Sequence, residues 1–433
     1  MRLQVPRLHR VACLLVLGVC LGVPARADLA EYLKRPEPAY KWTLQGTRDA
    51  EGVSVTTLSL TSQTWQGIEW KHRLLFYVPK QVRFPRFCTL INTGGDSDSS
   101  SDALGVPLAK ATGAPFAVLL SIPNQPLFGD RTEDDLVAYT WRKYMETGDE
   151  SWPLHFPMAK AVLKAMDALQ AYTKEANKPV PLSFLITGAS KRGWTTWLVG
   201  ASRDRRVRAI APMVIDVLNV VAQMKHQKEV YGTLSEQVDD YSKTGTAEAL
   251  TTPQGKRLME LEDPYSYRDI LTLPKLLLLG TNDRYWSQDS LNLYWDDLKG
   301  PKWVLYVPNS GHGLEDRTRA FGTLAAFVRC VAAGKPFPRI SWSYTGSPDK
   351  VDLAISATPV PKSARLFRAT SATQDFRDSK WTSEPMEQDK ASFEGTLAAA
   401  KGAYTACYGE ATFDLDGMPF TLSTQIRILP PAP

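Results

Sequence analysis

FLITGASKRGWTTWL, residues 184–198, joins an apolar run to an amphipathic stretch through a glycine, a serine, two cations and a second glycine. The apolar run is typical of a buried strand, and the stretch after Gly193 is typical of a helix. Cations at a helix start oppose the helix dipole, so a plain basic helix start explains this stretch poorly. A strand, a tight turn with a serine and a helix form a nucleophile elbow, which holds the serine above the sheet. The sequence therefore predicts Ser190 as a nucleophile beside Gly188, although Arg192 occupies the last position of the usual Gly-x-Ser-x-Gly spacing.

Residues 1–27 have the pattern of a secretory signal peptide. A basic start precedes a short apolar run, and the segment ends in ARA, which resembles a cleavage site. The apolar run is too short to span a bilayer well. We expect cleavage before Asp28 and a secreted or periplasmic protein with no stable membrane insertion afterwards. Cleavage lowers the formal charge from +5 to +1, because the segment carries four arginines and no acids. The basic balance is therefore no indication of nucleic-acid binding.

Apolar runs alternate with helical patterns between residues 28 and 338. The runs are short and almost continuously apolar, which is typical of a mainly parallel sheet covered by helices on both faces. They span residues 74–79, 88–93, 116–123, 182–187, 207–215, 275–281 and 302–308. Helical patterns occupy residues 158–176, the stretch after Gly193, residues 289–299 and residues 317–334. Together with the elbow, this alternation predicts an α/β-hydrolase fold over residues 28–338.

Three segments depart from the alternation. Residues 124–157 form a long connection, and residues 219–268 form a polar, helix-prone insert. Long excursions in compact α/β proteins are usually lids or binding loops. After residue 338 the pattern changes to short alternating strands, which predicts a small β-sandwich domain over residues 339–433.

Composition argues against a disordered or membrane protein, and cysteine content argues against a cysteine-ligated metal site. The chain has 433 residues, of which 43% are hydrophobic and 22% charged, as in soluble globular proteins. After signal cleavage it keeps Cys88, Cys330 and Cys407, which allow at most one disulfide and lack the spacing of metal ligands. We therefore expect no metal and no organic cofactor. The sequence gives no indication of the oligomeric state.

Three residues far apart in the chain form a candidate catalytic triad. A serine hydroxyl is a weak nucleophile unless a histidine takes its proton and an acid orients that histidine. His312 lies between two glycines directly after the last strand of the sheet, where this fold delivers its base. Asp283 follows the preceding strand, and Ser190, Asp283, His312 is the chain order that the fold requires. Asp283 could instead be a turn former, with Asp216 as the reserve acid, whereas Asp289 is better explained as a helix N-cap.

An oxyanion hole is predicted from two loops near the serine. The backbone amide of Lys191, which follows the serine, supplies one donor. The loop INTGGDSDSS supplies the second through Gly95, and Gly94 and Gly95 let backbone amides approach a substrate closely. This loop could equally be a solvated turn. Tyr285 and Trp286, just beyond the candidate acid, are expected to line the substrate pocket, unless they serve only in packing.

Two interpretations of the cations after the serine remain open. In the first, Lys191 or Arg192 stabilises the oxyanion or binds an anionic group of the substrate. In the second, Arg192 pairs with a structural carboxylate such as Glu133 or Asp134 beneath the elbow.

The chain resembles the PhoPQ-activated pathogenicity-related proteins, a family of α/β-hydrolases that is similar to the amoebal autocrine proliferation repressor. The resemblance covers nearly the whole mature chain. It rests on TGASKRGWTTWL, INTGGD, SIPNQPLFGDRTEDDLVAYTW, FPMAKAVLKAMDALQ, GTNDRYW, NSGHGL and DFRDSKW. It implies a secreted serine hydrolase with Ser190, Asp283 and His312 as its triad.

The resemblance leaves the substrate open. Similarity to the amoebal protein implies dipeptidyl-peptidase-like activity, so a small peptide is the first expected substrate. The elbow is also similar to the Gly-Cys-Ser-Arg-x-Gly elbow of glucuronoyl esterases, which makes a carbohydrate or carboxylic ester the second. In those enzymes an arginine follows the serine, whereas Lys191 does so here. A third possibility is a secreted binding or signalling protein without activity, since a fold does not fix a function.

Overall fold

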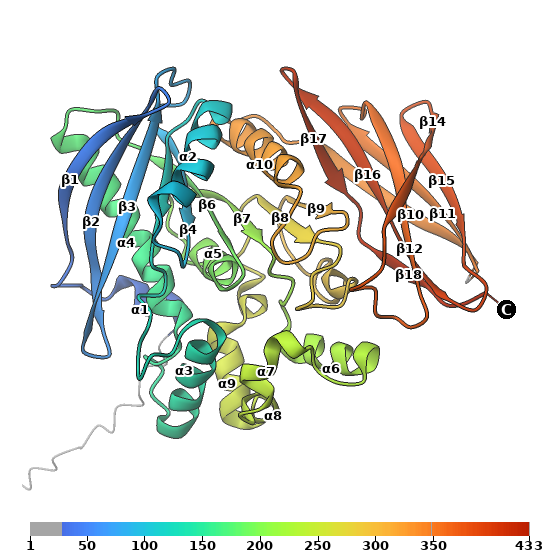
Figure 1. Cartoon of the computed structure of the whole chain (residues 1–433), viewed down its shortest axis with the longest axis horizontal. Helices are drawn as coiled ribbons and strands as arrows, with labels where there is room; N and C mark the ends of the chain where they lie inside the picture. The colour runs from blue at the N-terminus through green and yellow to red at the C-terminus, as the bar shows by residue number, and fades with distance from the viewer. Residues whose placement is uncertain (1–27, 348, 433) are drawn as a thin grey trace, which may run out of the picture.

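The computed structural model describes residues 28–347 and 349–432 (Figure 1). The signal peptide predicted over residues 1–27 lies outside the described residues. A long sheet runs through the whole molecule, in the strand order β1-β2-β3-β5-β4-β6-β7-β8-β9-β17-β16-β12-β13.

The middle of this sheet is parallel and buried. Its strands are β4 (Phe87–Asn92), β5 (Phe116–Leu119), β6 (Ser183–Ala189), β7 (Val207–Met213), β8 (Lys275–Gly280) and β9 (Lys302–Val307). They pair in parallel in the order β5-β4-β6-β7-β8-β9. Every residue of β4 and β8 is buried, which explains their continuous apolar sequences. The predicted strand runs are confirmed, since each coincides with one strand.

Helices cover both faces of the parallel strands. One face packs against α4 (His155–Glu175) and α5 (Lys191–Ala201), and the other packs against α2 (Asp98–Thr112) and α10 (Arg317–Ala332). Each face has its own hydrophobic core, one containing Trp197 of α5 and the other containing Phe327 of α10. This is the α/β-hydrolase fold that the sequence predicted.

An antiparallel part precedes the parallel strands. After α1 (Leu29–Lys34), strands β1 (Lys41–Ala50), β2 (Val53–Trp65) and β3 (Ile68–Pro79) form a meander, and β3 pairs with β5 in antiparallel orientation. Of these strands, the sequence analysis found only the end of β3. Strand β1 is an edge strand with almost no buried residues, so its sequence carries no apolar pattern.

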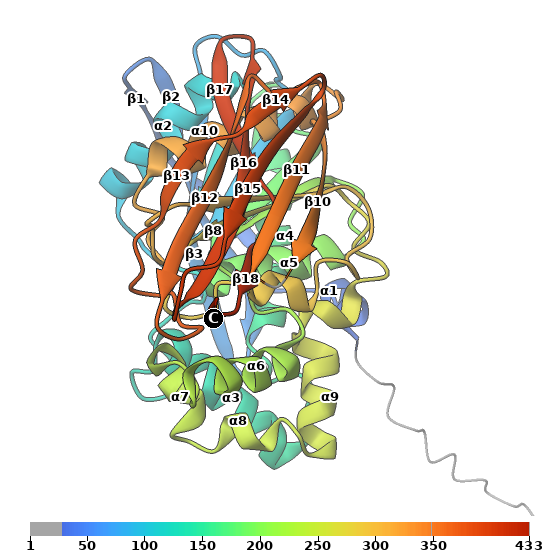
Figure 2. The same ribbon diagram turned by 90° about the vertical axis from the view of Figure 1, so that its right-hand side faces the viewer.

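Both long excursions lie at the same end of the sheet. The predicted insert after β7 contains α6 (Val220–Tyr231), α7 (Asp239–Ser242), α8 (Thr246–Ala249) and α9 (Pro253–Glu262). The connection at 124–157 contains α3 (Glu133–Thr147), which the sequence analysis did not predict. Figures 1 and 2 show α3 gathered with α6 to α9 below the sheet, and α3 contacts α7, α8 and α9.

The helix predicted over 289–299 is wrong. Only Ser290–Leu293 forms a short 3₁₀ turn. Asp289 does not cap it, because its carboxylate accepts a hydrogen bond from His226 Nε2 at 2.8 Å instead. Asn292 donates to the backbone carbonyl of Ile426 at 2.9 Å. The segment is therefore held in an irregular path by side-chain bonds to other parts of the fold.

The C-terminal strands form two facing layers (Figure 2). One contains β10 (Arg339–Ser347), β11 (Lys350–Thr358), β15 (Ser392–Ala398) and β14 (Glu387–Asp389). The other contains β17 (Met418–Ser423), β16 (Tyr404–Leu415), β12 (Ser363–Ser371), β13 (Thr382–Pro385) and β18 (Arg427–Leu429). The second layer continues the hydrolase sheet, because β17 pairs with β9. The sequence did not indicate this continuity, and the domain boundary at residue 338 stays a prediction.

Two further observations concern disulfide bonds and membrane-spanning helices. Cys88, Cys330 and Cys407 are buried free thiols in the described chain. Within residues 28–347 and 349–432, no helix is both long enough and apolar enough to cross a bilayer.

Candidate active site

Ser190 stands on a strained turn between β6 and α5. Its backbone has φ 57° and ψ −126°, a conformation that residues other than glycine rarely adopt. Its amide is fixed by a 2.9 Å hydrogen bond to the carbonyl of Met213. The neighbouring glycines permit this close packing: a Cβ on Gly188 would lie 2.5 Å from Asn92, and one on Gly193 would lie 2.7 Å from Ile215. The strand, turn and helix thus have the geometry of a nucleophile elbow.

Asp283 and His312 meet at the same edge of the sheet. Asp283 follows β8 and is 3% exposed, and His312 follows β9. The Nδ1 atom of His312 lies 2.8 Å from Oδ2 of Asp283. The loops can approach closely because Gly280 has no side chain. A Cβ built on it would lie only 2.4 Å from the carbonyl oxygen of Ser310. The other carboxylate oxygen of Asp283 accepts the backbone amide of Tyr285 at 3.0 Å.

Asp216, the reserve acid, has a different partner. Its Oδ1 accepts a 2.6 Å hydrogen bond from the hydroxyl of Tyr294. Burial raises the pKa of Asp216 to about 8, and the nearby charge of Asp283 adds to this rise, against the hydrogen bond from Tyr294. Burial thus favours the protonated form of Asp216, which contacts Tyr294 instead of the histidine, whereas a triad needs a carboxylate to orient its histidine. The acid beside His312 is Asp283.

The other histidines have partners away from the elbow. His72 lies 2.9 Å from the hydroxyl of Ser62. His155 pairs with Glu262, but both side chains are fully buried and no solute reaches them. Together with the His226–Asp289 pair described above, these contacts leave His312 as the histidine that meets Asp283 at the edge of the sheet.

The Nε2 atom of His312 is the ring nitrogen that does not contact Asp283. It is buried and has no hydrogen-bond partner within the described residues, and no hydrogen bond joins it to Ser190. The ring of Tyr285 stacks on the imidazole with centroids 4.2 Å apart. Catalytic hydrogen bonds are often long in unliganded enzymes and tighten when substrate binds. The imidazole is thus oriented by Asp283 on one nitrogen, with the other left unoccupied.

The two cations after the serine are paired with carboxylates of α3. Arg192 is 7% exposed, and two of its guanidinium nitrogens each donate to Glu133 at 2.7 Å. Lys191 lies 2.9 Å from Asp134 and 3.1 Å from Glu133. Burial acts to raise the pKa of Glu133, but the hydrogen bonds and charges of Arg192 and Lys191 outweigh it and lower the pKa to about 2. Arg192 therefore pairs with a structural carboxylate, as in the second of the two interpretations given above.

Replacing Glu133 by glutamine tests this charge cluster. Its pKa is below the ordinary value of 4.5, so the carboxylate stabilises the fold above that pH and this contribution disappears as pH falls toward 2. Because the side chain is half-exposed, we expect Glu133→Gln to cost roughly 1 to 2 kcal/mol at pH 7. Thermal unfolding of both proteins should show a difference that shrinks below pH 4.5. The control is Glu146→Gln on the same helix, which removes an exposed pair with Lys143; equal stability of Glu133→Gln and the wild type at pH 7 would contradict the account.

The loop after β4 lies over Arg192. A Cβ on Gly94 would lie 1.9 Å from Nη2 of Arg192, so the guanidinium fills the space beneath this loop. The carbonyl of Gly95 accepts the amide of Ser121 at 3.0 Å, and the amide of Gly95 has only a long 3.4 Å contact with Thr93. Lys191 is the first residue of α5, so its amide has no acceptor within the helix. These two amides are the donors predicted for an oxyanion hole.

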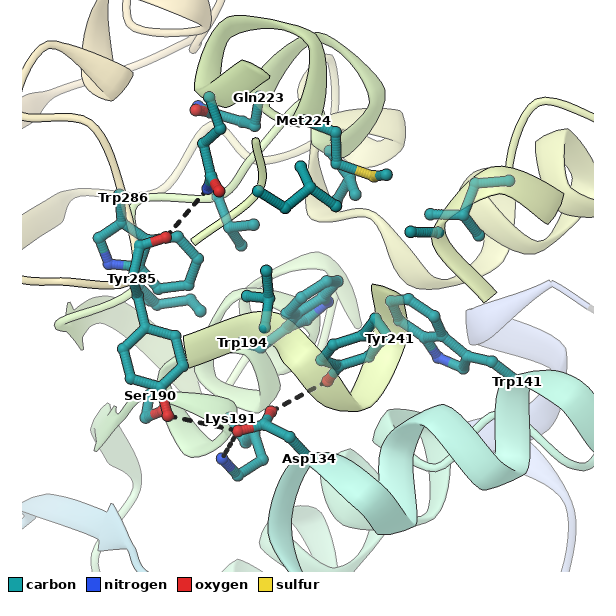
Figure 3. A pocket seen from close by; sticks show the side chains of 18 residues that line it. Asp134, Trp141, Ser190, Lys191, Trp194, Gln223, Met224, Tyr241, Tyr285 and Trp286 are labelled. Carbon is teal, nitrogen blue, oxygen red and sulfur yellow. Dashed lines mark hydrogen bonds and ion pairs between the residues drawn. The ribbon is translucent and has the colours of Figure 1, made fainter. Parts of the chain in front are cut away.

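A cavity opens beside Ser190, between α5 and the insert (Figure 3). Of the predicted site residues, Ser190, Lys191, Tyr285 and Trp286 line it. Arg192, Gly94 and Gly95, which were also predicted to contact substrate or oxyanion, lie outside its wall in the described chain. Most of the wall comes from α3 and the insert, which the sequence analysis named only as binding-loop candidates.

A loop from the C-terminal strands holds the two loops that carry Asp283 and His312. Asn282, next to the acid, donates to the carbonyls of Arg377 and Ser379 at 3.1 and 2.7 Å. Asn309, in the histidine loop, exchanges hydrogen bonds of 3.0 and 2.8 Å with the backbone of Trp381. Arg377 also reaches Glu236 of the insert at 2.8 Å. The sequence analysis quoted DFRDSKW only as part of a resemblance, and its clustered charges were the available signal.

The chain has relatives among known proteins. The profile of a family described as "PhoPQ-activated pathogenicity-related protein" matches residues 29–377. The chain is 33% identical over 395 residues to autocrine proliferation repressor protein A of Dictyostelium discoideum, covering 86% of this chain and 79% of that protein.

Solved structures resemble it more distantly. Acetyl xylan esterase 1 from Thermoanaerobacterium sp. JW/SL YS485 aligns with a TM-score of 0.47 and 14% identity, covering 68% of this chain and 92% of the esterase. A glucuronoyl esterase from Solibacter usitatus aligns with a TM-score of 0.40 and 13% identity, covering 70% and 90%.

Proposed function

The chain belongs to the family of PhoPQ-activated pathogenicity-related proteins, and we propose that it is a serine hydrolase that forms an acyl-enzyme on Ser190. The observation that carries the proposal is the 2.8 Å contact between His312 Nδ1 and Asp283 Oδ2, at the edge of the sheet where Ser190 stands on its strained turn.

Each residue has a defined role in the proposed reaction. The Oγ atom of Ser190 attacks the carbonyl carbon of the substrate while Nε2 of His312 takes its proton. The negative charge that develops on the carbonyl oxygen is held by the amides of Lys191 and Gly95. His312 then protonates the leaving group, which departs. Water repeats the sequence on the acyl-Ser190 bond, and Asp283 remains a carboxylate that orients the imidazole throughout.

The charges near the serine favour an ester over a peptide. A peptidase that reads a free chain end binds that charge with an opposite charge of its own. Asp134 and Lys191 are the charged side chains of the cavity wall, and they are paired with each other at 2.9 Å. Breaking a buried pair to bind a peptide terminus would leave one partner uncompensated. We therefore propose a carboxylic ester as the substrate, and peptides, which the sequence analysis placed first, form the second arm of the test.

The test compares ester and peptide hydrolysis by the full chain. We expect turnover of p-nitrophenyl esters, slower or no turnover of dipeptidyl p-nitroanilides, and loss of at least about 10³ in kcat in Ser190→Ala. Ser202→Ala, at the other end of α5, is the matched control and should retain its activity. Ester turnover by Ser190→Ala above a tenth of the wild-type rate would refute the proposal.

A further inference from the structure

The cavity beside Ser190 has an almost wholly apolar wall. Beyond the residues next to the serine, it is formed by side chains such as Trp141, Trp194, Val217, Met224, Leu234 and Leu250. In Figure 3, Ser190 lies at one end of the group, and Met224 and Trp141 lie away from it. Exposing apolar surface of this kind to water is unfavourable in free energy, so the cavity is suited to bind apolar groups.

The polar groups of the wall are already in use or neutral. Asp134 is paired with Lys191 at 2.9 Å. The side-chain amide of Gln227 donates to a backbone carbonyl at 2.9 Å. Among the described wall residues, Gln223 Oε1 and Trp286 Nε1 are buried without a partner, and both are uncharged. The wall therefore selects a ligand by shape and apolar contact rather than by charge.

The position of the histidine decides which half of an ester enters the cavity. The leaving alcohol takes its proton from Nε2 of His312, so it must lie on the histidine side of the serine. The described residues that line the cavity include Ser190 but not His312. The alcohol therefore leaves outside the cavity, and the acyl group, which stays bonded to Ser190, occupies it.

The far end of the cavity is closed by one layer of side chains. Met224, Ala247 and Leu250 line both the cavity and a groove on the outer surface of the insert. Val221, which lines the groove, is 43% exposed. Met224 is unbranched and flexible, so this wall can adjust to a chain that reaches it.

We infer that the cavity binds the acyl group of the ester and that this group is an aliphatic chain. Its carbonyl lies at Ser190, and its methyl end points toward Met224 and Ala247. The inference rests on the proposed function and names the substrate class of the same site. Each methylene that moves from water into such a wall is worth about 0.8 kcal/mol, or roughly a fourfold gain in kcat/KM.

A series of p-nitrophenyl esters tests the inference. From acetate through butyrate to hexanoate, we expect kcat/KM of the full chain to rise by at least about tenfold, since methylenes are added to the buried part of the substrate. A kcat/KM that is highest for acetate and falls with chain length would overturn the inference while leaving the serine hydrolase intact.

A bulky residue at the far end of the cavity provides the matched variant. Ala247→Phe is expected to lower the ratio of hexanoate to acetate kcat/KM by at least about tenfold, because the ring fills the space for the chain end. Ala249→Phe, on the same short helix but outside the cavity wall, should leave the ratio unchanged. Equal ratios in both variants would contradict the placement of the chain.

Binding without turnover separates this inference from the proposed function. In Ser190→Ala, hexanoic acid should change the tryptophan fluorescence, because Trp141, Trp194 and Trp286 line the cavity. Ala247→Phe combined with Ser190→Ala should abolish that change. Binding that persists when no ester is hydrolysed by the wild type would sink the proposed reaction but support the ligand class. Absence of both binding and chain-length dependence would overturn the inference.

Discussion

Asp283→Asn is expected to lower kcat for ester hydrolysis by about 10⁴. An asparagine retains the shape of the side chain, but its amide cannot hold the imidazole in the tautomer that leaves Nε2 free to accept a proton. It also cannot stabilise the imidazolium that forms when Ser190 is deprotonated. The 2.8 Å contact between His312 and Asp283 places this loss in kcat rather than in substrate binding, so KM should change little.

Asp216→Asn is the matched control for this result. Asp216 accepts a hydrogen bond from the hydroxyl of Tyr294 and burial raises its pKa, so a neutral asparagine can replace it with this hydrogen bond kept. We expect kcat to stay within about tenfold of the wild type, in contrast to the loss of about 10⁴ in Asp283→Asn. A larger loss in Asp216→Asn than in Asp283→Asn would show that the acid has been misassigned.

Gly94→Ala is expected to lower kcat by about 10² to 10³, the typical effect of losing one oxyanion donor. The added methyl would lie 1.9 Å from Nη2 of Arg192. The guanidinium cannot retreat without breaking its two 2.7 Å bonds to Glu133. The loop must therefore move, and the amide of Gly95 moves with it.

Gly95→Ala is the control that adds the same methyl group to the loop without a clash with Arg192. No atom lies within 4 Å of a Cβ built on Gly95, and the backbone amide is retained. Its effect on kcat should be at least about tenfold smaller than that of Gly94→Ala, when both are measured with the same ester. Circular dichroism of the two variants confirms that each is folded. Similar losses in both variants would mean that the clash with Arg192 does not control the loop.

The parallel strands and the elbow were predictable because their signals are local. A fully buried strand such as β8 has a continuous apolar sequence, and the elbow at Ser190 compresses a strand end, a turn and a helix start into a few residues. Strand β1 and helix α3 gave weaker signals, because β1 is exposed along most of its length and α3 is polar at its start. The helix expected at 289–299 failed because side-chain bonds to distant segments override its local spacing.

The sequence indicated which residues could form the candidate site, but it did not indicate which other residues hold them in place. Lys191 and Arg192 looked misplaced at a helix start, and the sequence could not choose between substrate and structural partners. Their carboxylates lie on α3, more than fifty residues earlier in the chain. The bonds from Asn282 and Asn309 to the C-terminal loop were also beyond prediction, since a backbone carbonyl leaves no trace in a sequence.

Labelling with a fluorophosphonate tests the central claim most directly, because the probe reacts only with an activated serine. The account predicts that peptide mapping of the labelled wild type finds the phosphonate on Ser190, and that His312→Ala is labelled at least about 100-fold more slowly. Labelling of His312→Ala at the wild-type rate, or modification of a different residue, would contradict it.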